Sequence, residues 1–222
     1  MARRRATRSS ASLRRPSKWI ARPPTKSRRP LKSGSKLTTV AVTGGIGAGK
    51  SAALEAFAGH GAATISSDEI VHRLLREDEE VHAALRERWG AQIVGPGGAD
   101  RAAIAAIVFE QPDELAWLEG LLHPKVVQEY LAWREQQTAP VAVIEVPLLY
   151  ETGGDERFDA VVVVTAPAEL RAERSRVSAD ARERRLIPDE EKVRRADFAY
   201  VNDGTLAELD AFVADVMARL TQ

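Results

Sequence analysis

The chain contains no cysteine among its 222 residues. This absence excludes a disulfide framework, a cysteine-ligated zinc site and a thiol nucleophile. Long apolar runs are also missing, because no stretch reaches the ~18 residues that a membrane-spanning helix needs. Hydrophobic residues nevertheless make up 44% of the chain, which is enough for one sizeable core. We therefore expect one domain in the cytoplasm, without a membrane partner.

A surplus of either charge is missing too, since 32 basic residues balance 32 acidic ones. The two signs are unevenly distributed, because residues 1–36 contain 13 basic residues and no acidic one, whereas residues 37–222 carry 19 basic against 32 acidic. The first segment is rich in Ser, Pro and Arg and predicts a basic disordered tail before an acidic domain. Three interpretations of this tail stay open. It is an arm for nucleic acid or another anionic surface, an organelle-targeting presequence, or an extension from a start codon assigned too far upstream.

Beyond the tail, apolar runs and helical patterns alternate. Four segments predict strands: a buried strand at 37–43, a short one at 62–65, and two continuous apolar runs at 141–146 and 160–165, which are typical of strands covered on both faces. Only helices, with a loop at 91–100, are expected over 69–136, and Pro112 opens a long helix there. The pattern predicts a three-layer α/β/α fold with a parallel sheet. The all-helical insert is expected over the carboxyl edge of the sheet.

A glycine-rich motif, TGGIGAGKS at 43–51, lies between the first predicted strand and a helix. It satisfies the phosphate-loop pattern G-x-x-x-x-G-K-[ST] in the required context. Glycines permit positive φ and let backbone N–H groups approach phosphate oxygens, while the helix directs its positive end at them. Lys50 is expected to reach the β and γ phosphates of ATP, and the Ser51 hydroxyl to bind Mg²⁺. The predicted nucleotide-binding residues here are Gly44, Gly45, Ile46, Gly47, Ala48, Gly49, Lys50 and Ser51.

The fate of the bound phosphate is indicated by two further features, both typical of a small-molecule kinase. Asp68 follows the second predicted strand, 18 residues after Lys50. Carboxyl ends of adjacent parallel strands face one crevice, so Asp68 is a candidate base for an acceptor hydroxyl. The alternative is a helix N-cap or a first-turn acid. The second feature is an Arg-rich segment at 170–187, a candidate lid over the nucleotide, whose alternative is a solvated, salt-bridged helix face.

Glu145 ends the run at 141–146 and occupies the place of a Walker B acid. One interpretation is that it helps to hold Mg²⁺ through water. The other is an acid on the surface at the edge of the sheet.

Five motifs, spread over residues 37–222, carry a family resemblance. They are VTGGIGAGKS, SDEIVHRLL, LLHPKV, EVPLLYETG and EEKVRRADFAYVNDG. Together they resemble the dephospho-CoA kinase family, a group of P-loop kinases. The resemblance implies that the γ phosphate of ATP is transferred to the ribose 3′ hydroxyl of dephospho-coenzyme A, the last step of coenzyme A synthesis.

The resemblance also implies roles for individual residues. Asp68 and Lys50 are the implied catalytic residues. Acceptor-side residues are implied at His123, Pro147, Leu148 and Glu151. Implied nucleotide contacts are the lid arginines Arg174 and Arg182, together with Asn202 and Gly204 near the adenine. The chain departs from the family pattern at Ser66, where an Asp is usual, and at Leu186, where a Gln is frequent.

Two other functions stay open at this point. The nearer one is a different small P-loop kinase, acting on a nucleoside monophosphate or a sugar acid. The more distant one is a nucleic-acid-associated NTPase that uses the basic tail as an arm, which predicts ATP hydrolysis stimulated by DNA or RNA.

Overall fold

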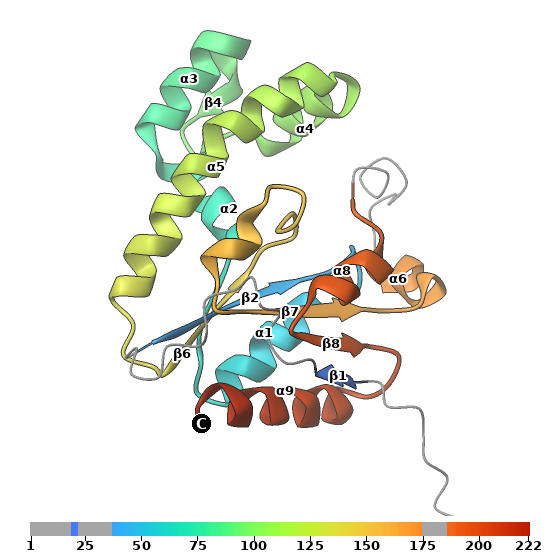
Figure 1. Ribbon diagram of the computed structural model, residues 1–222. Helices are drawn as coiled ribbons and strands as arrows, with labels where there is room; N and C mark the ends of the chain where they lie inside the picture. The colour runs from blue at the N-terminus through green and yellow to red at the C-terminus, as the bar shows by residue number, and fades with distance from the viewer. Residues whose placement is uncertain (1–18, 22–36, 175–185) are drawn as a thin grey trace, which may run out of the picture.

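The computed structural model describes residues 19–21, 37–174 and 186–222. A six-stranded sheet forms the centre, with the order β1-β8-β7-β2-β6-β3 (Figure 1). Its strands are β1 (Trp19–Ala21), β2 (Thr38–Thr43), β3 (Ala63–Ser66), β6 (Val141–Glu145), β7 (Ala160–Thr165) and β8 (Phe198–Val201). All neighbouring strands pair in parallel except β1, which pairs antiparallel with β8.

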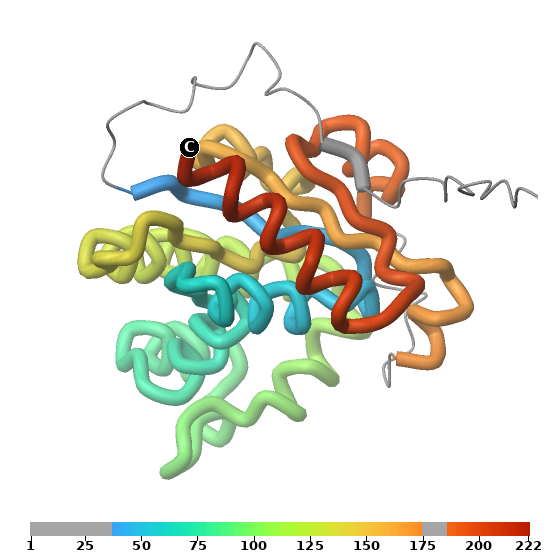
Figure 2. The backbone as a smooth tube through the Cα atoms, turned by 90° about the horizontal axis from the view of Figure 1, so that it is seen from below, coloured from blue at the N-terminus to red at the C-terminus, as the bar shows by residue number. Residues whose placement is uncertain are grey.

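Helices cover both faces of this sheet. Those next to it are α1 (Lys50–Gly59), α6 (Ala168–Arg174), α8 (Asp189–Arg195) and α9 (Leu206–Leu220), with the 3-10 turn η2 (Gly154–Arg157) after β6. Seen from below, α9 crosses one face of the sheet beside α1 (Figure 2). The remaining elements form a lobe at one end: α2 (Ser67–Glu77), α3 (Glu79–Trp89), η1 (Ala91–Ile93), β4 (Val94–Gly95), β5 (Gly98–Ala99), α4 (Arg101–Glu110) and α5 (Pro112–Glu135).

The side chains of β2 show why three layers form. Val40 and Val42 point into a core with Phe57 of α1 and Phe212 of α9, whereas Ala41 joins the other core, on the side of the lobe. Alternate side chains of a strand face opposite sides of the sheet, so a central strand that is apolar at every position requires cover on both faces. The predicted α/β fold with three layers is therefore confirmed.

The lobe departs from the prediction in one element. The loop expected at 91–100 contains a short antiparallel hairpin, β4–β5, so the expectation of helices alone is wrong there. Each strand is only two residues long, too short for an alternating pattern to be visible in the sequence. The long helix expected from Pro112 is confirmed, and it continues through Pro124 to Glu135.

A second departure concerns residues 1–36, which we expected to be a tail outside the fold. Within this segment, Trp19–Ala21 adds β1 to the edge of the sheet, with Ile20 opposite Ala199. The sheet is therefore mixed at this edge, and it begins before residue 37. Three residues that pair with a strand far along the chain leave no periodic signal. The rest of the predicted tail lies outside the described residues.

In the part of the chain that the structure describes, no helix has both the length and the apolar character required to cross a membrane.

Candidate active site

The phosphate loop connects β2 to α1 and depends on three glycines with positive φ. Gly44, Gly47 and Gly49 have φ values of 151°, 73° and 97°. A Cβ atom at Gly44 would overlap the carbonyl oxygen of Val164 in β7, and one at Gly49 would overlap the side-chain amide of Asn202. These positions require glycine, because their φ values are positive and because neighbouring atoms leave no room for a Cβ atom. The loop lies against the carboxyl end of the sheet.

Lys50 and Glu145 form the charged centre beside this loop. The Lys50 ammonium donates a hydrogen bond to the Gly45 carbonyl (3.1 Å), and its Nζ lies 3.9 Å from Glu145 Oε1. Burial lowers the pKa of Lys50, and the carboxylates of Glu145 and Asp68 oppose that decrease. Burial likewise raises the pKa of Glu145, against the effect of the Lys50 ammonium. Glu145 is only 6% exposed, so its interpretation as a surface acid is wrong.

Asp68 lies near the same charged centre, at the start of α2. The registers place Ser66 of β3 and Val42 of β2 level with Glu145 of β6, which brings the start of α2 next to the phosphate loop. The hydroxyl of Ser66 caps α2 and accepts a hydrogen bond from the Asp68 N–H (3.2 Å). Asp68 is therefore not the cap, although it does lie in the first turn of α2. Its exposed carboxylate acts electrostatically on both Lys50 and Glu145.

Residues of α6 and of the loop after β8 lie beside the phosphate loop. Asn202 donates its side-chain amide to the Ala48 carbonyl (2.9 Å), and Arg174 donates to the Asn202 carbonyl (3.2 Å). Two predicted nucleotide-side residues are thus joined to the phosphate loop. Gly204 follows in the same loop and is exposed, while Arg182 lies outside the described residues.

Arg171 is a site residue that the sequence analysis missed. A Cβ atom added to Gly45 would lie 2.5 Å from its guanidinium, and one added to Gly47 would lie 2.6 Å from its carbonyl oxygen. It therefore lies directly over the phosphate loop. The available signal was its position one helical turn before Arg174, since residues three apart share a helix face.

Three of the four predicted acceptor-side residues, Pro147, Leu148 and Glu151, lie in the loop that follows β6. The Pro147 carbonyl accepts a hydrogen bond from the Thr43 hydroxyl (3.2 Å), which ties this loop to the end of β2. Leu148 accepts a hydrogen bond from Thr152 (2.9 Å). His123 is exposed on α5, one residue before Pro124. The acceptor roles of these residues stay predictions.

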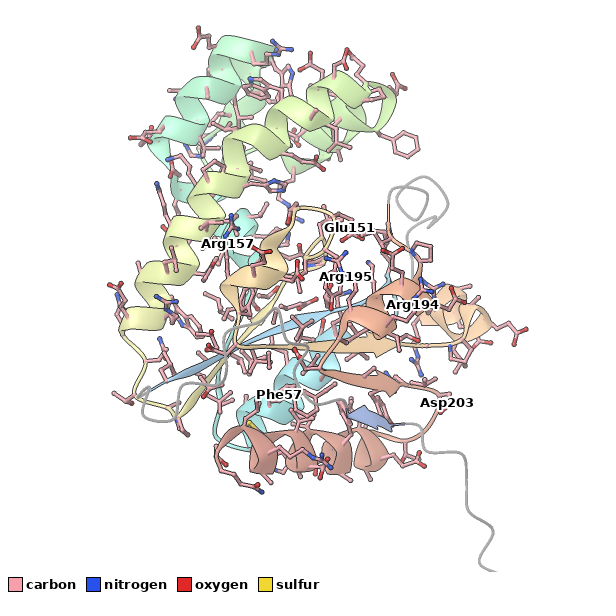
Figure 3. The ribbon with its side chains drawn as sticks, in the orientation of Figure 1. Phe57, Glu151, Arg157, Arg194, Arg195 and Asp203 are labelled. Carbon is pink, nitrogen blue, oxygen red and sulfur yellow. The ribbon has the colours of Figure 1, made fainter. Side chains whose placement is uncertain are left out.

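Glu151 lies in this loop, and its carboxylate is contacted by two groups of the protein. Its Oε1 accepts the Ile187 N–H (2.9 Å) and lies 2.8 Å from the ammonium of Lys192 in α8. Figure 3 shows Glu151 and Arg195 on one side of the sheet, opposite Phe57 of α1. The sequence analysis missed Lys192, because a lysine after three acids in DEEKVRR is typical of a solvated helix face.

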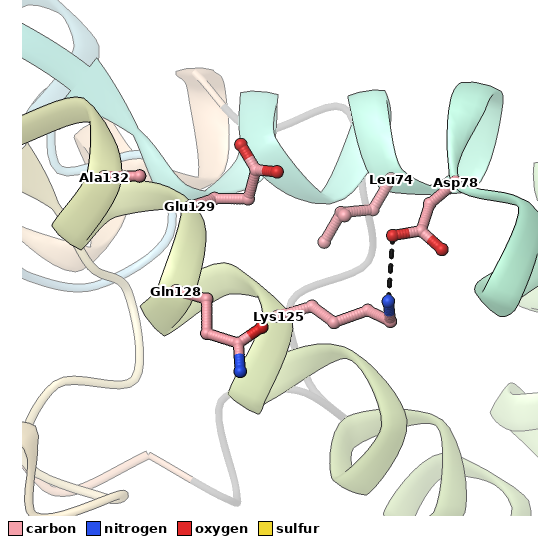
Figure 4. A pocket seen from close by; sticks show the side chains of 6 residues that line it. All are labelled: Leu74, Asp78, Lys125, Gln128, Glu129 and Ala132. Atoms are coloured by element: carbon pink, nitrogen blue, oxygen red, sulfur yellow. Dashed lines mark hydrogen bonds and ion pairs between the residues drawn. The ribbon is translucent and has the colours of Figure 1, made fainter.

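The lobe carries a separate hollow of about 200 Å³. Figure 4 shows its lining residues, which are Leu74, Asp78, Lys125, Gln128, Glu129 and Ala132. Lys125 crosses it with ion pairs to Asp78 (2.9 Å) and Glu80 (2.7 Å). The hollow is formed by the end of α2 and the middle of α5, so it is distinct from the crevice at the start of α2.

The strand, loop and helix around Lys50, together with two carboxylates at the carboxyl edge of a mostly parallel sheet, define the class of the protein. It is a P-loop kinase, a protein that binds a nucleotide through its phosphate loop. Comparison with known proteins specifies the family. The family model for dephospho-CoA kinase matches residues 38–208, and the chain belongs to this family.

Individual relatives agree with this assignment. A dephospho-CoA kinase of Rhodopseudomonas palustris is 38% identical over 172 residues, which cover 73% of this chain and 85% of the relative. One of Thermus thermophilus is 34% identical over 189 residues, covering 82% of this chain and 91% of the relative.

Solved structures extend the similarity to the fold. A crystal structure of a Thermus thermophilus protein superimposes with a TM-score of 0.72 at 33% identity, covering 85% of this chain and all of that one. The dephospho-CoA kinase of Campylobacter jejuni gives a TM-score of 0.59 at 26% identity, covering 84% of this chain and 98% of that one.

Proposed function

We propose that the protein transfers the γ phosphate of ATP to the ribose 3′ hydroxyl of dephospho-coenzyme A, giving ADP and coenzyme A. The observation that carries the proposal is the convergence of Lys50, Glu145 and Asp68 beside the phosphate loop of a chain that belongs to this family. The use of ATP as the donor is compatible with the cytoplasmic location expected from the sequence.

In the proposed reaction, the loop holds the donor and Asp68 prepares the acceptor. The backbone N–H groups of the loop and the Lys50 ammonium surround the phosphates and offset their charge. The 3′ oxygen of the acceptor attacks the γ phosphorus and the bond to the β–γ bridging oxygen breaks, so that ADP leaves. The proton of the 3′ hydroxyl passes to the Asp68 carboxylate, which is exposed at the crevice and therefore accessible to an acceptor.

The donor atoms present fit Mg²⁺, although no group of three or more acidic or histidine side chains that could bind a metal occurs among the described residues. Mg²⁺ commonly takes one or two protein oxygens, substrate phosphates and water. Ser51 at the start of α1 would supply a hydroxyl, and Glu145 would orient a bound water. When bound, the ion neutralises charge on the β and γ phosphate oxygens.

A coupled ADP-release assay with alternative acceptors tests the proposal. We expect turnover with dephospho-coenzyme A and little with AMP, adenosine or a sugar acid. Turnover with AMP but not with dephospho-coenzyme A would sink the assignment in favour of another small kinase. Stimulation of ADP release by RNA or DNA, lost on deletion of residues 1–18, would instead favour the nucleic-acid-associated NTPase; this deletion keeps β1.

The variant Asp68→Asn tests the role of the base. Loss of a general base lowers rates by about 10²- to 10⁴-fold, and we expect kcat to fall within this range while the Kd of ATP changes little. Ser66→Ala is the matched control for the start of α2, because it removes the cap of the same helix without removing the carboxylate. Wild-type kcat in Asp68→Asn would refute the role of the base and leave the fold intact.

A further inference from the structure

Lys192 is fully buried, with 0% of its side chain exposed, although it belongs to the charged helix α8. A lysine ammonium is removed from water at a high cost unless it is paired, and buried pairs are weak evidence for stability. Its partner is Glu151, with Nζ 2.8 Å from Oε1. The second carboxylate oxygen of Glu151 has no hydrogen-bond partner among the residues described. Among the described residues, the ion pair with Glu151 is therefore what compensates the buried ammonium of Lys192.

The carboxylate of Glu151 connects two segments that are far apart in the sequence. Glu151 lies in the loop after β6, whose Pro147 is tied to the end of β2 by the Thr43 hydroxyl. The same oxygen that faces Lys192 accepts the N–H of Ile187, two residues before α8. One carboxylate thus attaches the acceptor-side loop both to the start of α8 and to its interior.

The first residue of α8 also reaches the phosphate loop. Asp189 lies one helical turn before Lys192, and a Cβ atom added to Gly45 would lie 3.5 Å from its carboxylate oxygen. The charges of Asp189 and Lys192 both act on the Lys50 ammonium, in opposite directions. Within one turn, α8 therefore contacts the phosphate loop and holds the loop after β6.

We propose that Lys192 is a positioning residue for phosphoryl transfer, which sets the acceptor-side loop at 146–153 against the phosphate loop by holding Glu151. This inference rests on the proposed function, because it assigns a task to the acceptor side of the same site. A displacement of about 1 Å in a reacting group costs about 100-fold in rate. A link between the two loops therefore affects kcat more than it affects the binding of either substrate.

A second link between α8 and the same loop supplies a control. Arg195 pairs with Asp155 at 3.3 Å, and its guanidinium lies 4.2 Å from the ring centre of Tyr150. This link attaches the end of α8 to Asp155 and Tyr150 and leaves the ion pair between Lys192 and Glu151 in place. We expect its loss to affect the stability of the fold without a specific effect on the reaction.

The experiment compares Lys192→Met with Arg195→Met in the full chain. For each variant we would measure Tm, the Kd of ATP by calorimetry, and kcat with dephospho-coenzyme A at a temperature where the protein is folded. We expect both variants to lower Tm. Only Lys192→Met should lower kcat, by about 10- to 100-fold, with the Kd of ATP within about twofold of wild type. A kcat within about twofold of wild type, or an equal loss in Arg195→Met, would overturn the proposal.

A double variant, Lys192→Met with Glu151→Leu, covers the case in which Lys192→Met does not fold. It removes both charges together, so that no isolated charge stays buried, and apolar replacements of buried pairs fold well. The hydrogen bond to Ile187 is also lost, so we expect Tm to recover while kcat stays low. Recovery of both Tm and kcat would mean that the pair is structural only, and would overturn the proposal.

The outcome is independent of the identity of the acceptor. The wild type is first measured with dephospho-coenzyme A, and failure of that reaction contradicts the proposed function alone. If the wild type uses another acceptor, the same series with that acceptor still tests the effect of Lys192 on kcat.

Discussion

Gly49→Ala tests the geometry of the phosphate loop most directly. Gly49 caps the N-terminus of α1 with φ 97° and ψ 29°, a left-handed conformation. An alanine costs about 1–2 kcal/mol in this conformation. Its Cβ would also overlap the side-chain amide of Asn202, which donates to the Ala48 carbonyl at 2.9 Å. The displaced hydrogen bond costs about 1–2 kcal/mol more, because a buried acceptor loses its partner. The free energy of unfolding should therefore fall by about 2–4 kcal/mol in total.

This decrease in the free energy of unfolding is large enough to measure as a shift in Tm. In a domain of about 200 residues, 1 kcal/mol shifts Tm by about 2–4 °C, so Gly49→Ala should lower Tm by about 5–15 °C. The same change distorts the N–H groups that face the phosphates, and we expect weaker ATP binding. Thermal unfolding by circular dichroism and calorimetric titration with ATP measure the two effects.

Gly120→Ala is the matched control. Gly120 lies inside α5, and an added Cβ has nothing within 4 Å. Alanine is favoured over glycine in a helix by about 1 kcal/mol, so this variant should be slightly more stable than wild type. If Gly49→Ala keeps Tm within about 2 °C of wild type and binds ATP normally, our account of the loop is refuted.

Two further predictions concern charge and the edge of the sheet. Burial raises the pKa of Glu145 in the folded protein above its ordinary value of 4.5. The folded state therefore loses stability as pH rises from the pKa of Glu145 in the unfolded chain to its higher pKa in the folded protein. The stability difference between Glu145→Gln and wild type, measured by urea unfolding from pH 4 to 8, should shift in favour of the variant across that range of pH; a difference independent of pH contradicts the buried charge. Deletion of residues 1–21 removes β1 from the edge of β8, and should lower Tm and speed hydrogen exchange in β8, whereas deletion of residues 1–18 should do neither. Equal exchange in the two deletions would mean that β1 does not protect this edge.

The parts of the structure that the sequence predicts are those that local patterns specify. Continuous apolar runs indicate the central strands, because a strand buried on both faces has no polar side. The phosphate loop follows from glycine spacing. The position of Asp68 opposite Lys50 follows from the rule that parallel strands end at one edge. The sequence left open whether Asp68 caps α2, and the structure assigns the cap to Ser66.

The parts that escaped prediction depend on contacts between distant segments. Three residues at Trp19–Ala21 become a strand only because β8 offers an unpaired edge. Lys192 resembles a solvated helical lysine until the chain brings Glu151, 41 positions earlier, to its ammonium. Arg171 is one of six arginines in the segment 170–185, and its place over the phosphate loop follows from the packing of α6, which the sequence does not reveal. Such contacts leave no periodic signal along the chain.

The central claim is that the γ phosphate of ATP goes to a hydroxyl of dephospho-coenzyme A. The most direct measurement is a product analysis by mass spectrometry and ³¹P NMR after incubation with ATP, Mg²⁺ and dephospho-coenzyme A. We predict one molecule of 3′-phosphorylated product for each ADP released, and none with Asp68→Asn over the same time. ADP release accompanied by free phosphate instead of the phosphorylated product would contradict the account.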